Sequence, residues 1–412
     1  MTISAPAFQY WPRASKGFLP PAMSFQRLAT TAYVVGPTGL LTPVNANVPR
    51  LYYDPFIIGS AQGTLIEQAS TNICLQSAFA ASWAAGDTTI ATNVGPDQLG
   101  TTTAASIVED SSNTSHYAQQ FVTFANSTTY TFSVYVVPNG RQYVGMYFPT
   151  ATFATSGRAA LFNLSGSGSV LAVDSGVAAN IQTGYAGGYL ISITATSNAA
   201  ASGNAVIWLG SASSSSTAIQ TYTGNGTSGI YAWGAQIEAA NQPTSRIPTA
   251  TVSLSRSADA LSIPLASIPG YNPLQGSLMV SGWTPLTSAN APYFATLDTN
   301  GSTADRLGIY QSSGGSIWAA YNNVADTFHQ VAGGAGGNGN YFAAAISWIS
   351  GTLTVSLNGG ATASTSIAGI QSFTYLRIGT YSGYTTVCNS AISRVALYSR
   401  ALTGADLQAI AA

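Results

Sequence analysis

Short runs of alternating residues, each followed by glycine, asparagine, aspartate or serine, restrict this chain to a fold made of β-strands. In the clearest run, 230–238, the side chains of Tyr231, Trp233, Ala235 and Ile237 alternate with smaller or polar ones. Successive side chains of a strand point to opposite faces, so this pattern predicts a strand whose Tyr231, Trp233, Ala235 and Ile237 face a core. Helix formation is favoured only at the end of the chain, where Thr403 can cap a helix and Asp406 lies near its positive end.

The strand-like runs form two groups, and 412 residues suit two domains of ordinary size. The first group, within residues 76–246, comprises Tyr130–Val137, Tyr143–Phe148, Ala159–Leu164, Tyr189–Thr196, Ala205–Leu209 and Ile230–Glu238. The second, within 276–412, comprises Ser277–Thr284, Tyr293–Asp298, Arg306–Tyr310, Ser316–Tyr321, Tyr341–Ile349, Thr352–Leu357, Tyr375–Gly379 and Ala391–Tyr398. Residues 247–275 predict a linker with one strand at Ala260–Ile263. We therefore expect an all-β chain with two antiparallel β-sandwich (jelly-roll) domains.

Residues 1–75 contain eight prolines, which disfavour long helices and central strands. The segment is therefore expected to be extended and to serve attachment or oligomerisation. Its apolar residues, such as Tyr10, Trp11, Phe18 and Phe25, have no obvious partner within the chain. This predicts packing on a neighbouring subunit or a larger particle, and a homo-oligomer, most simply a trimer.

The low charge content excludes several classes of partner. Only 6% of residues are charged and the formal net charge is −1, so there is no basic surface for nucleic acid. No apolar run is long enough for membrane insertion, and the first thirty residues lack the sections of a cleavable secretory signal. Cys74 and Cys388 are expected to be buried and unpaired.

The sequence gives little support for catalysis. His116 and His329 are the only histidines, and no Gly-x-Ser-x-Gly motif is present. A glycosidase needs two facing carboxylates, and nothing distinguishes a pair such as Asp298 and Asp305. The glycine-rich stretch at 333–339 lacks the Lys-Ser/Thr of a phosphate loop and predicts a flexible tip. A non-enzymatic protein is expected.

Flat aromatic faces with nearby amides or hydroxyls are what sugar binding requires. The best candidate surface is in the second domain and comprises Tyr310, Trp318, Tyr321, Asn322 and Asn323. Tyr310 and Trp318 have core packing as the alternative, which leaves Tyr321 and Asn322 as the favoured pair. In the first domain, Gln236 and Glu238 are candidates together with Tyr135 and Tyr147, with structural hydrogen bonding as the alternative.

Oxygen ligands for a structural Ca²⁺ ion are present in one loop. Asp298, Asn300 and Asp305 could hold such an ion, although they are also typical solvated turn residues. No other cofactor is expected.

Three stretches resemble the phage head spike fibre family, which occurs in tailed phages, prophages and gene transfer agents. The first runs through Phe25-Gln26-Arg27, Asn47-Val48-Pro49-Arg50, Asp54-Pro55 and Gly63-Thr64-Leu65-Ile66-Glu67. The second is Tyr231–Glu238 with Pro243-Thr244-Ser245 and Arg256-Ser257-Ala258-Asp259, similar to the end of a carbohydrate-binding jelly roll. The third, Ile392–Thr403, resembles the last strand of laminin-G-like and concanavalin-like sandwiches. One departure is Gly187-Gly188-Tyr189-Leu190, where the jelly roll has Gly-Trp-Tyr-Arg.

The resemblance implies a structural spike or fibre protein on a virion surface, assembled in the host cytoplasm and released by lysis. Its expected partners are copies of itself, other structural proteins of the particle and a host-surface polysaccharide bound during adsorption. Two alternatives stay open: a tailspike-like polysaccharide depolymerase and a purely structural capsid decoration protein.

Overall fold

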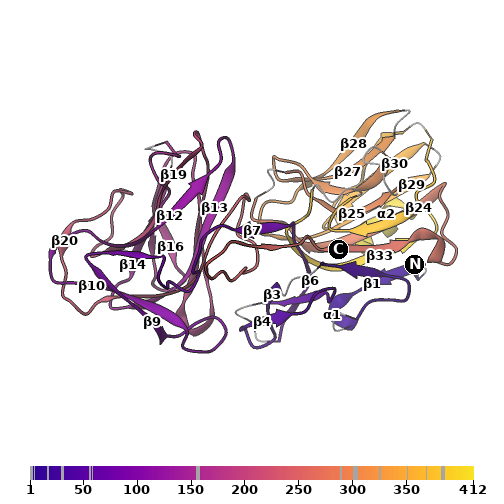
Figure 1. Cartoon of the computed structure of the whole chain (residues 1–412). Coiled ribbons are helices and arrows are strands. Elements are labelled where there is room, and N and C mark those ends of the chain that lie inside the picture. The colour runs from indigo at the N-terminus through magenta and orange to yellow at the C-terminus, as the bar shows by residue number, and fades with distance from the viewer. Residues whose placement is uncertain are drawn as a thin grey trace.

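The computed structural model describes residues 3, 5–15, 18–28, 32–54, 57, 59–154, 158–287, 290–299, 305–323, 326–349, 351–367, 369–381 and 386–412. Two β-sandwiches lie next to each other, and both chain ends are at the second one (Figure 1). The all-β fold with two antiparallel sandwiches is therefore confirmed. Among the described residues, no helix has the length and apolar character needed to cross a membrane.

The first sandwich consists of two six-stranded antiparallel sheets. One sheet contains, in spatial order, β17 (Ala178–Thr183), β18 (Tyr189–Thr196), β13 (Thr129–Asn139), β21 (Gly229–Glu238), β10 (Ala104–Glu109) and β9 (Thr88–Gly95). The other contains β16 (Ser169–Val173), β15 (Ala159–Asn163), β14 (Tyr143–Tyr147), β19 (Ala201–Gly210), β12 (His116–Phe124) and β8 (Ala84–Gly86). Their inner faces enclose an aromatic core in which the Phe148 and Phe153 rings stack at 4.3 Å between centroids.

The second sandwich contains the remaining long strands. One sheet comprises β31 (Ala363–Ser366), β30 (Thr352–Leu357), β29 (Tyr341–Ile349), β24 (Gln275–Trp283), β33 (Ser390–Tyr398), β6 (Ala61–Ile66) and β5 (Arg50–Tyr53), with β1 (Phe8–Tyr10) also on β33. The other comprises β2 (Ser24–Gln26), β23 (Ala260–Pro264), β32 (Tyr375–Ile378), β25 (Tyr293–Asp298), β26 (Arg306–Gln311), β27 (Ser316–Asn323) and β28 (Asp326–Ala335). Apolar residues of both sheets form one buried core, including the fully buried Trp348.

Shorter elements connect these sheets. They are β3 (Ala32–Val35) paired with β4 (Leu41–Val44), β7 (Ser70–Asn72) with β22 (Leu254–Arg256), and β11 (Asn113–Thr114) with β20 (Tyr222–Thr223), besides α1 (Pro12–Ser15) and the 3₁₀ turns Tyr185–Gly187 and Leu265–Ser267. The expected C-terminal helix is α2 (Gly404–Ile410), whose Asp406 N–H donates to the Thr403 hydroxyl at 3.3 Å. Cys74 and Cys388 are buried and free, as expected.

The N-terminal segment is built into the second sandwich rather than left without a partner in its own chain. β1 and β6 pair end to end along one edge of β33, and β2 pairs with the edge of β23. Tyr10 and Phe25 lie in the core, at 0% and 6% exposure. The physical reason is that β33 and β23 present open edges, whose backbone groups need pairing. The segment thus forms short strands, as its proline content allows, but the expectation that its apolar residues lack a partner within the chain is wrong.

A β-bulge changes the predicted facing of β21. Ser133 pairs with Gln236 but Tyr135 pairs with Trp233, so two residues of β21 lie opposite Val134. Gly234 takes φ +66° there, a conformation that glycine adopts without strain. The bulge shifts the alternation, and Trp233 therefore lies on the outer face while Ala235 and Ile237 face the core. The prediction that Tyr231 and Trp233 face the core is wrong.

The glycine-rich stretch that was expected to be a flexible tip is partly strand. β28 includes Gly334, which pairs with Ile317 of β27, and Gly333, which lies at a break in the register next to it. A side chain at 333 would contact Val355 at 3.1 Å, so glycine lets β28 pack closely over β30. Sequence composition alone does not reveal this packing.

Candidate functional site

An aromatic surface covers the outer side of the β25–β28 part of the second sandwich. On β27, Ile317, Ala319 and Tyr321 point into the core, whereas Trp318 and Ala320 lie on the opposite face. Trp318 pairs with Tyr310 of β26, so these two side chains share the outer face. We define the aromatic face as Tyr293, Tyr310, Trp318, Phe328 and Tyr381.

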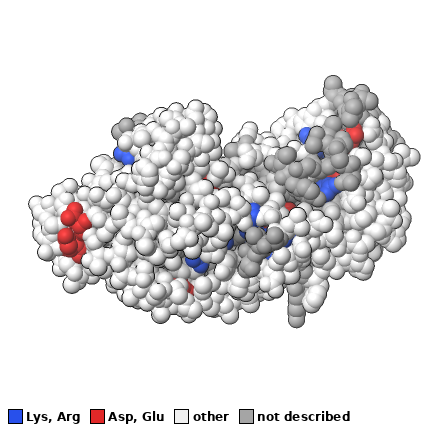
Figure 2. Space-filling model, viewed as in Figure 1, with Lys and Arg blue, Asp and Glu red and all other residues white. Residues whose placement is uncertain are grey.

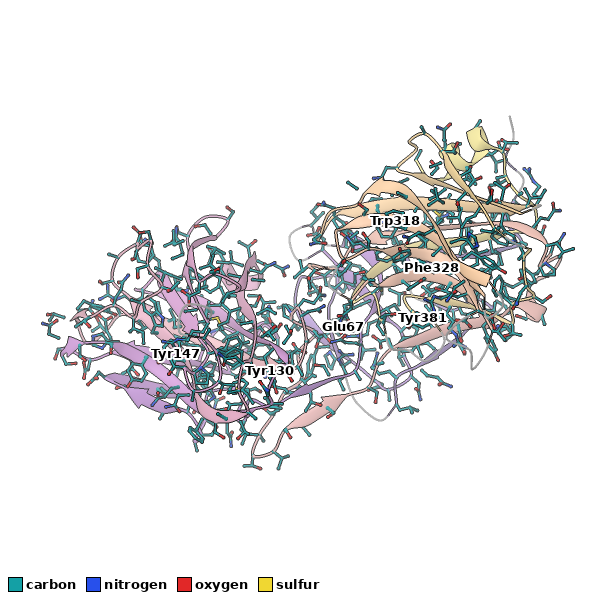
Figure 3. All side chains as sticks on the ribbon, turned by 90° about the horizontal axis from the view of Figure 1, so that it is seen from above. Glu67, Tyr130, Tyr147, Trp318, Phe328 and Tyr381 are labelled. Atoms are coloured by element: carbon teal, nitrogen blue, oxygen red, sulfur yellow. The ribbon has the colours of Figure 1, made fainter. Side chains whose placement is uncertain are left out.

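The rings of the aromatic face are in contact with one another. Tyr293 and Tyr310 stack with 5.1 Å between ring centroids, and Tyr381 meets Tyr293 edge-on at 5.2 Å. Phe328 lies 6.4 Å from Tyr310 and is 45% exposed. Figure 3 shows Trp318, Phe328 and Tyr381 in a row across the second sandwich. The face thus presents ring surface to solvent above a buried tyrosine pair.

Polar groups accompany these rings. The Arg306 guanidinium donates from Nε to the Tyr293 hydroxyl at 3.0 Å and lies over the Tyr381 ring. The Tyr310 hydroxyl donates to Gln330, and burial raises the pKa of Tyr310 to about 12, so this hydroxyl keeps its proton at neutral pH. The Trp318 indole N–H is buried without a hydrogen-bond partner among the described residues. The face therefore combines aromatic surface with hydrogen-bond donors and acceptors.

The structure separates the residues predicted for this surface. Tyr310 and Trp318, for which core packing was the alternative, lie together on the outer face. Tyr321 is fully buried in the core and its hydroxyl donates to the Gly369 carbonyl at 2.7 Å, so it is not available to a glycan. Asn322 is half-buried near the end of β27. The side chain of Asn323 lies outside the described residues.

The proposed calcium ligands are not arranged as a metal site within the described residues. Asp298 is fully buried, and both its carboxylate oxygens accept from Arg377 Nε, at 3.0 and 2.9 Å. Arg377 therefore already occupies the Asp298 carboxylate, and a Ca²⁺ site at Asp298, Asn300 and Asp305 stays a prediction. Asn300 lies outside the described residues. No group of three or more His, Cys, Asp or Glu side chains that could hold a metal ion occurs in the described part of the chain.

A buried ion network lies at the junction of the two sandwiches. Arg50 donates from Nη1 to Glu67 at 2.6 Å and from Nη2 to Asp259. Arg27 contacts Asp259 at 3.2 Å, and Arg256 contacts Glu67 at 3.4 Å. Figure 2 shows few charged side chains on this face of the molecule apart from an acidic patch at the end of the first sandwich farthest from the second. Three guanidinium groups thus share two carboxylates.

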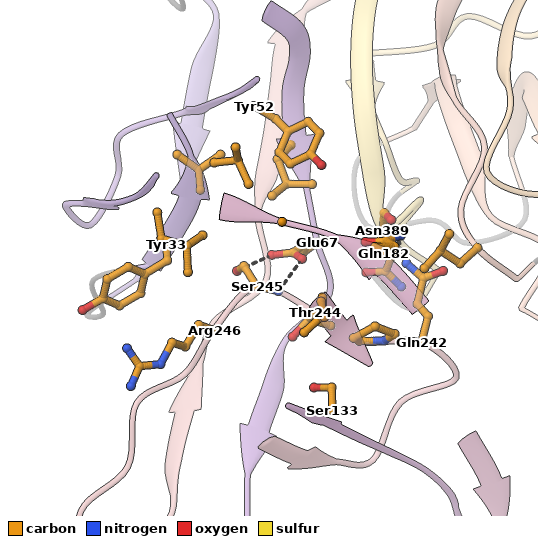
Figure 4. A pocket seen from close by; sticks show the side chains of 18 of the residues that line it. Tyr33, Tyr52, Glu67, Ser133, Gln182, Gln242, Thr244, Ser245, Arg246 and Asn389 are labelled. Atoms are coloured by element: carbon orange, nitrogen blue, oxygen red, sulfur yellow. Dashed lines mark hydrogen bonds between the residues drawn. The ribbon is translucent and has the colours of Figure 1, made fainter. Parts of the chain in front are cut away.

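The groups around Glu67 stabilise its ionised form. Burial by itself raises its pKa, but the charges of Arg50 and Arg256 and the hydrogen bond from Ser245 lower the pKa of Glu67 to about 2. Ser245 donates to Glu67 through its N–H at 2.7 Å and its hydroxyl at 2.6 Å, as Figure 4 shows. This carboxylate therefore attaches the segment after β21 to β6.

We expect a pH dependence of stability from Glu67. The folded-state pKa of about 2 lies below the ordinary 4.5. The unfolded chain therefore binds more protons in this window, and the contribution of Glu67 is complete above pH 4.5 and lost as the pH falls toward 2. Urea unfolding at several pH values in this range measures how steeply the free energy of unfolding rises with pH. This rise should be smaller in Glu67→Gln than in the wild type, by up to about 1.4 kcal/mol per pH unit. Equal slopes would contradict an ionised Glu67.

Gln236 and Glu238 have structural roles. Both are buried, and Glu238 accepts from the Ser70 hydroxyl, the Gln236 amide and both the N–H and hydroxyl of Thr244. Gln236 accepts from the Ile247 N–H at 2.8 Å. These bonds fix the segment that leaves the first sandwich. The glycan-binding assignment of these two residues is replaced by the structural alternative.

A cavity of about 310 Å³ lies between the sandwiches. Its wall comes from the β3–β4 hairpin, the outer face of the β13 sheet, the segment 242–246 and loops of the second sandwich. Tyr135 lines this cavity, whereas Tyr147 lies on the outer face of the opposite sheet against Arg158. Tyr135 and Tyr147 therefore do not line one groove, as was predicted, because only Tyr135 lies at this cavity.

No known protein family and no curated protein matches the chain. Solved structures with partial similarity include the CBM40 domain of the Ruminococcus gnavus IT-sialidase, at 18% identity and a TM-score of 0.30, over 37% of this chain and 93% of that one. The same domain bound to α2,3-sialyllactose has 16% identity and a TM-score of 0.29, over 33% and 82%. The binding domain of botulinum neurotoxin DC in complex with SialylT has 11% identity and a TM-score of 0.29, over 37% and 38%.

Proposed function

We propose that this chain binds glycans reversibly through the aromatic face of the second sandwich and has no catalytic activity. The observation that carries the proposal is the aromatic face itself, where Trp318 and the exposed Phe328 lie around Tyr310, whose hydroxyl contacts Gln330. Arg306 contacts the neighbouring Tyr293 and Tyr381. Aromatic rings pack against the apolar sides of pyranose rings, while guanidinium and amide groups bind sugar hydroxyls. Few charges are needed for such recognition.

The second part of the proposal is that the chain is a spike or fibre component on the surface of a phage-like particle. Its support is the sequence resemblance at Phe25–Arg27, Arg50, Glu67 and Arg256–Asp259. The same proposal includes a homo-oligomer, most simply a trimer, which is supported by apolar side chains of the N-terminal segment that stay exposed. Tyr10 and Phe25 are internal, whereas Trp11, Phe18 and Leu28 remain 46%, 77% and 64% exposed. Weak sites repeated across copies would gain affinity through avidity.

Trp318→Ala is expected to weaken glycan binding by about tenfold or more, because one central aromatic contact of a binding surface commonly contributes this much. A glycan array followed by titration of the best ligand measures the effect. Phe121→Ala is the control, since it removes an exposed aromatic side chain of β12 in the first sandwich, away from the aromatic face and from the N-terminal segment, and should leave affinity unchanged.

Three outcomes would reject parts of the proposal. Unchanged binding in Trp318→Ala would place the site elsewhere. A blank array and no binding to whole cells with folded protein would support a purely structural decoration protein. New reducing ends after incubation with host capsule would establish a depolymerase instead.

A further inference from the structure

The cavity between the sandwiches is within the size range of ligand sites. Its volume is about 310 Å³, at the lower end of the roughly 300–1,000 Å³ of small-molecule pockets. It is bounded by parts of the chain that are distant in sequence, including Tyr33, Gln98, Gln182 and Arg246. None of its lining residues belongs to the aromatic face, so a ligand can occupy the cavity whether or not the aromatic face binds a glycan.

The bulge in β21 determines one end of the cavity. It turns Trp233 to the outer face of the sheet, where this side chain lines the cavity. Gly234 also leaves room for Arg246, because a side-chain carbon at 234 would lie 3.2 Å from Arg246 Nε. Bulges frequently re-aim side chains next to binding sites. Here the bulge brings the Arg246 guanidinium into contact with the Trp233 ring.

Arg246 differs from the arginines of the neighbouring ion network. Its guanidinium carbon lies 3.4 Å from the centre of a Trp233 ring and 5.9 Å from that of Tyr33. It forms no ion pair or hydrogen bond with another described residue, and its Nε is buried without a partner. Arg27, Arg50 and Arg256 each contact a carboxylate. A guanidinium stacked by its face keeps its edge N–H groups for an anion.

The opposite end of the cavity is rich in amides, and the Glu67 carboxylate in the cavity wall already accepts hydrogen bonds from Arg50 and Ser245. Figure 4 shows Arg246 and Tyr33 at one end and Gln182, Gln242 and Asn389 at the other. Gln242 and Asn389 are already hydrogen-bonded, Gln242 to the Asn389 carbonyl and Asn389 to Gln68. Gln98 and Gln182 also line the cavity, and their side chains form no hydrogen bond with another described residue, so these two amides are available to ligand hydroxyls. Burial lowers the pKa of Arg246 to about 10, which leaves it charged at neutral pH.

We propose that this cavity binds a carboxylated sugar, a monosaccharide or the end of a longer glycan. Its carboxylate pairs with the edge of the Arg246 guanidinium, and its hydroxyls bind the amides at the other end. A carboxylate accepts two parallel hydrogen bonds from a guanidinium, which a neutral sugar of the same ring cannot do. The site therefore selects acidic over neutral saccharides.

Saturation-transfer NMR and calorimetry on the full chain, with D-glucuronic, D-galacturonic and N-acetylneuraminic acids as probes, test this site. D-glucose and D-galactose are the neutral counterparts of the two uronic acids. At least one acid is expected to bind more tightly than the neutral sugars, and Arg246→Gln should weaken it roughly 10- to 100-fold. Arg246→Lys keeps the positive charge but loses the two parallel N–H donors, so its affinity for the acid should lie between those of the wild type and Arg246→Gln.

Two further variants separate this site from other effects. Arg158→Gln, which removes another arginine stacked on a ring, at 4.6 Å from Tyr147, should leave binding of the acid unchanged. Trp318→Ala should also leave it unchanged, so loss of the aromatic face and loss of the cavity site are distinguishable. No preference for any of the three acids, or equal binding by folded Arg246→Gln, would overturn the inference.

Discussion

Replacing Arg50 with methionine is expected to lower the free energy of unfolding by about 3–5 kcal/mol. Arg50 is fully buried and donates to Glu67, Asp259 and the Tyr33 carbonyl. Its removal leaves Glu67 with the hydrogen bonds from Ser245 and, as counter-charge, the 3.4 Å contact to Arg256, while Asp259 keeps Arg27. A buried carboxylate without a close counter-charge is costly, because the interior solvates it poorly. The loss should exceed that of most single substitutions.

Arg13→Met is the control for Arg50→Met, since Arg13 belongs to the same N-terminal segment but is exposed. Its effect should stay within about 0.5 kcal/mol. Urea unfolding followed by tryptophan fluorescence measures both variants, with each transition fitted separately because the chain has two sandwiches. A loss below about 1 kcal/mol in Arg50→Met would mean that the ion network does not hold the junction together.

The ion network gives a physical meaning to the motifs on which the family resemblance rests. Arg27, Arg50 and Glu67 come from the N-terminal stretch, and Arg256 and Asp259 from the stretch after the first sandwich. These residues are separated by about half the chain, yet they form one buried cluster. The motif spacing thus reflects the closure of the N-terminal segment onto the linker. The sequence identifies the motif residues but not their contacts.

Most strands could be predicted because each carries its own period-two pattern. Tyr189–Thr196 and Tyr341–Ile349 have the predicted bounds. The pattern failed where a feature depends on distant residues. The edges of β33 and β23 determine the position of the N-terminal strands, and the bulge at Gly234 reverses the facing of Trp233. Neither is visible in local alternation.

The candidate surface was predicted in part for a similar reason. Alternation along β27 could have placed Tyr321 with Ile317 in the core and Trp318 opposite them, because odd and even positions face opposite sides. Tyr293, Phe328 and Tyr381 join Tyr310 only through strand pairing and loop packing. The cavity residue Arg246 carried no sequence signal at all. Its interest comes from contacts that only the fold creates.

Gly63→Ala is expected to destabilise the second sandwich by about 2–4 kcal/mol. Gly63 lies in β6 where this strand meets β33, and its φ of +150° is unfavourable for other residues. A Cβ atom there would lie 2.2 Å from the carbonyl oxygen of Ile392. Since the obstacle is backbone, relief requires β6 to move away from β33. The free energy of unfolding and the rate of proteolysis within residues 1–75 should both report this separation.

Gly59→Ala measures the backbone-strain part of that effect without the steric clash. Gly59 also has a positive φ, +79°, but no atom lies within 4 Å of the position that its Cβ would take. Its cost should therefore be backbone strain alone, about 1–2 kcal/mol, without faster proteolysis of the N-terminal strands. If Gly63→Ala costs no more than Gly59→Ala, close contact between β6 and β33 does not hold the N-terminal segment in place. If it costs more and β6 is released, the segment is an integral part of the second sandwich, and the junction that carries Glu67 and Arg246 depends on it.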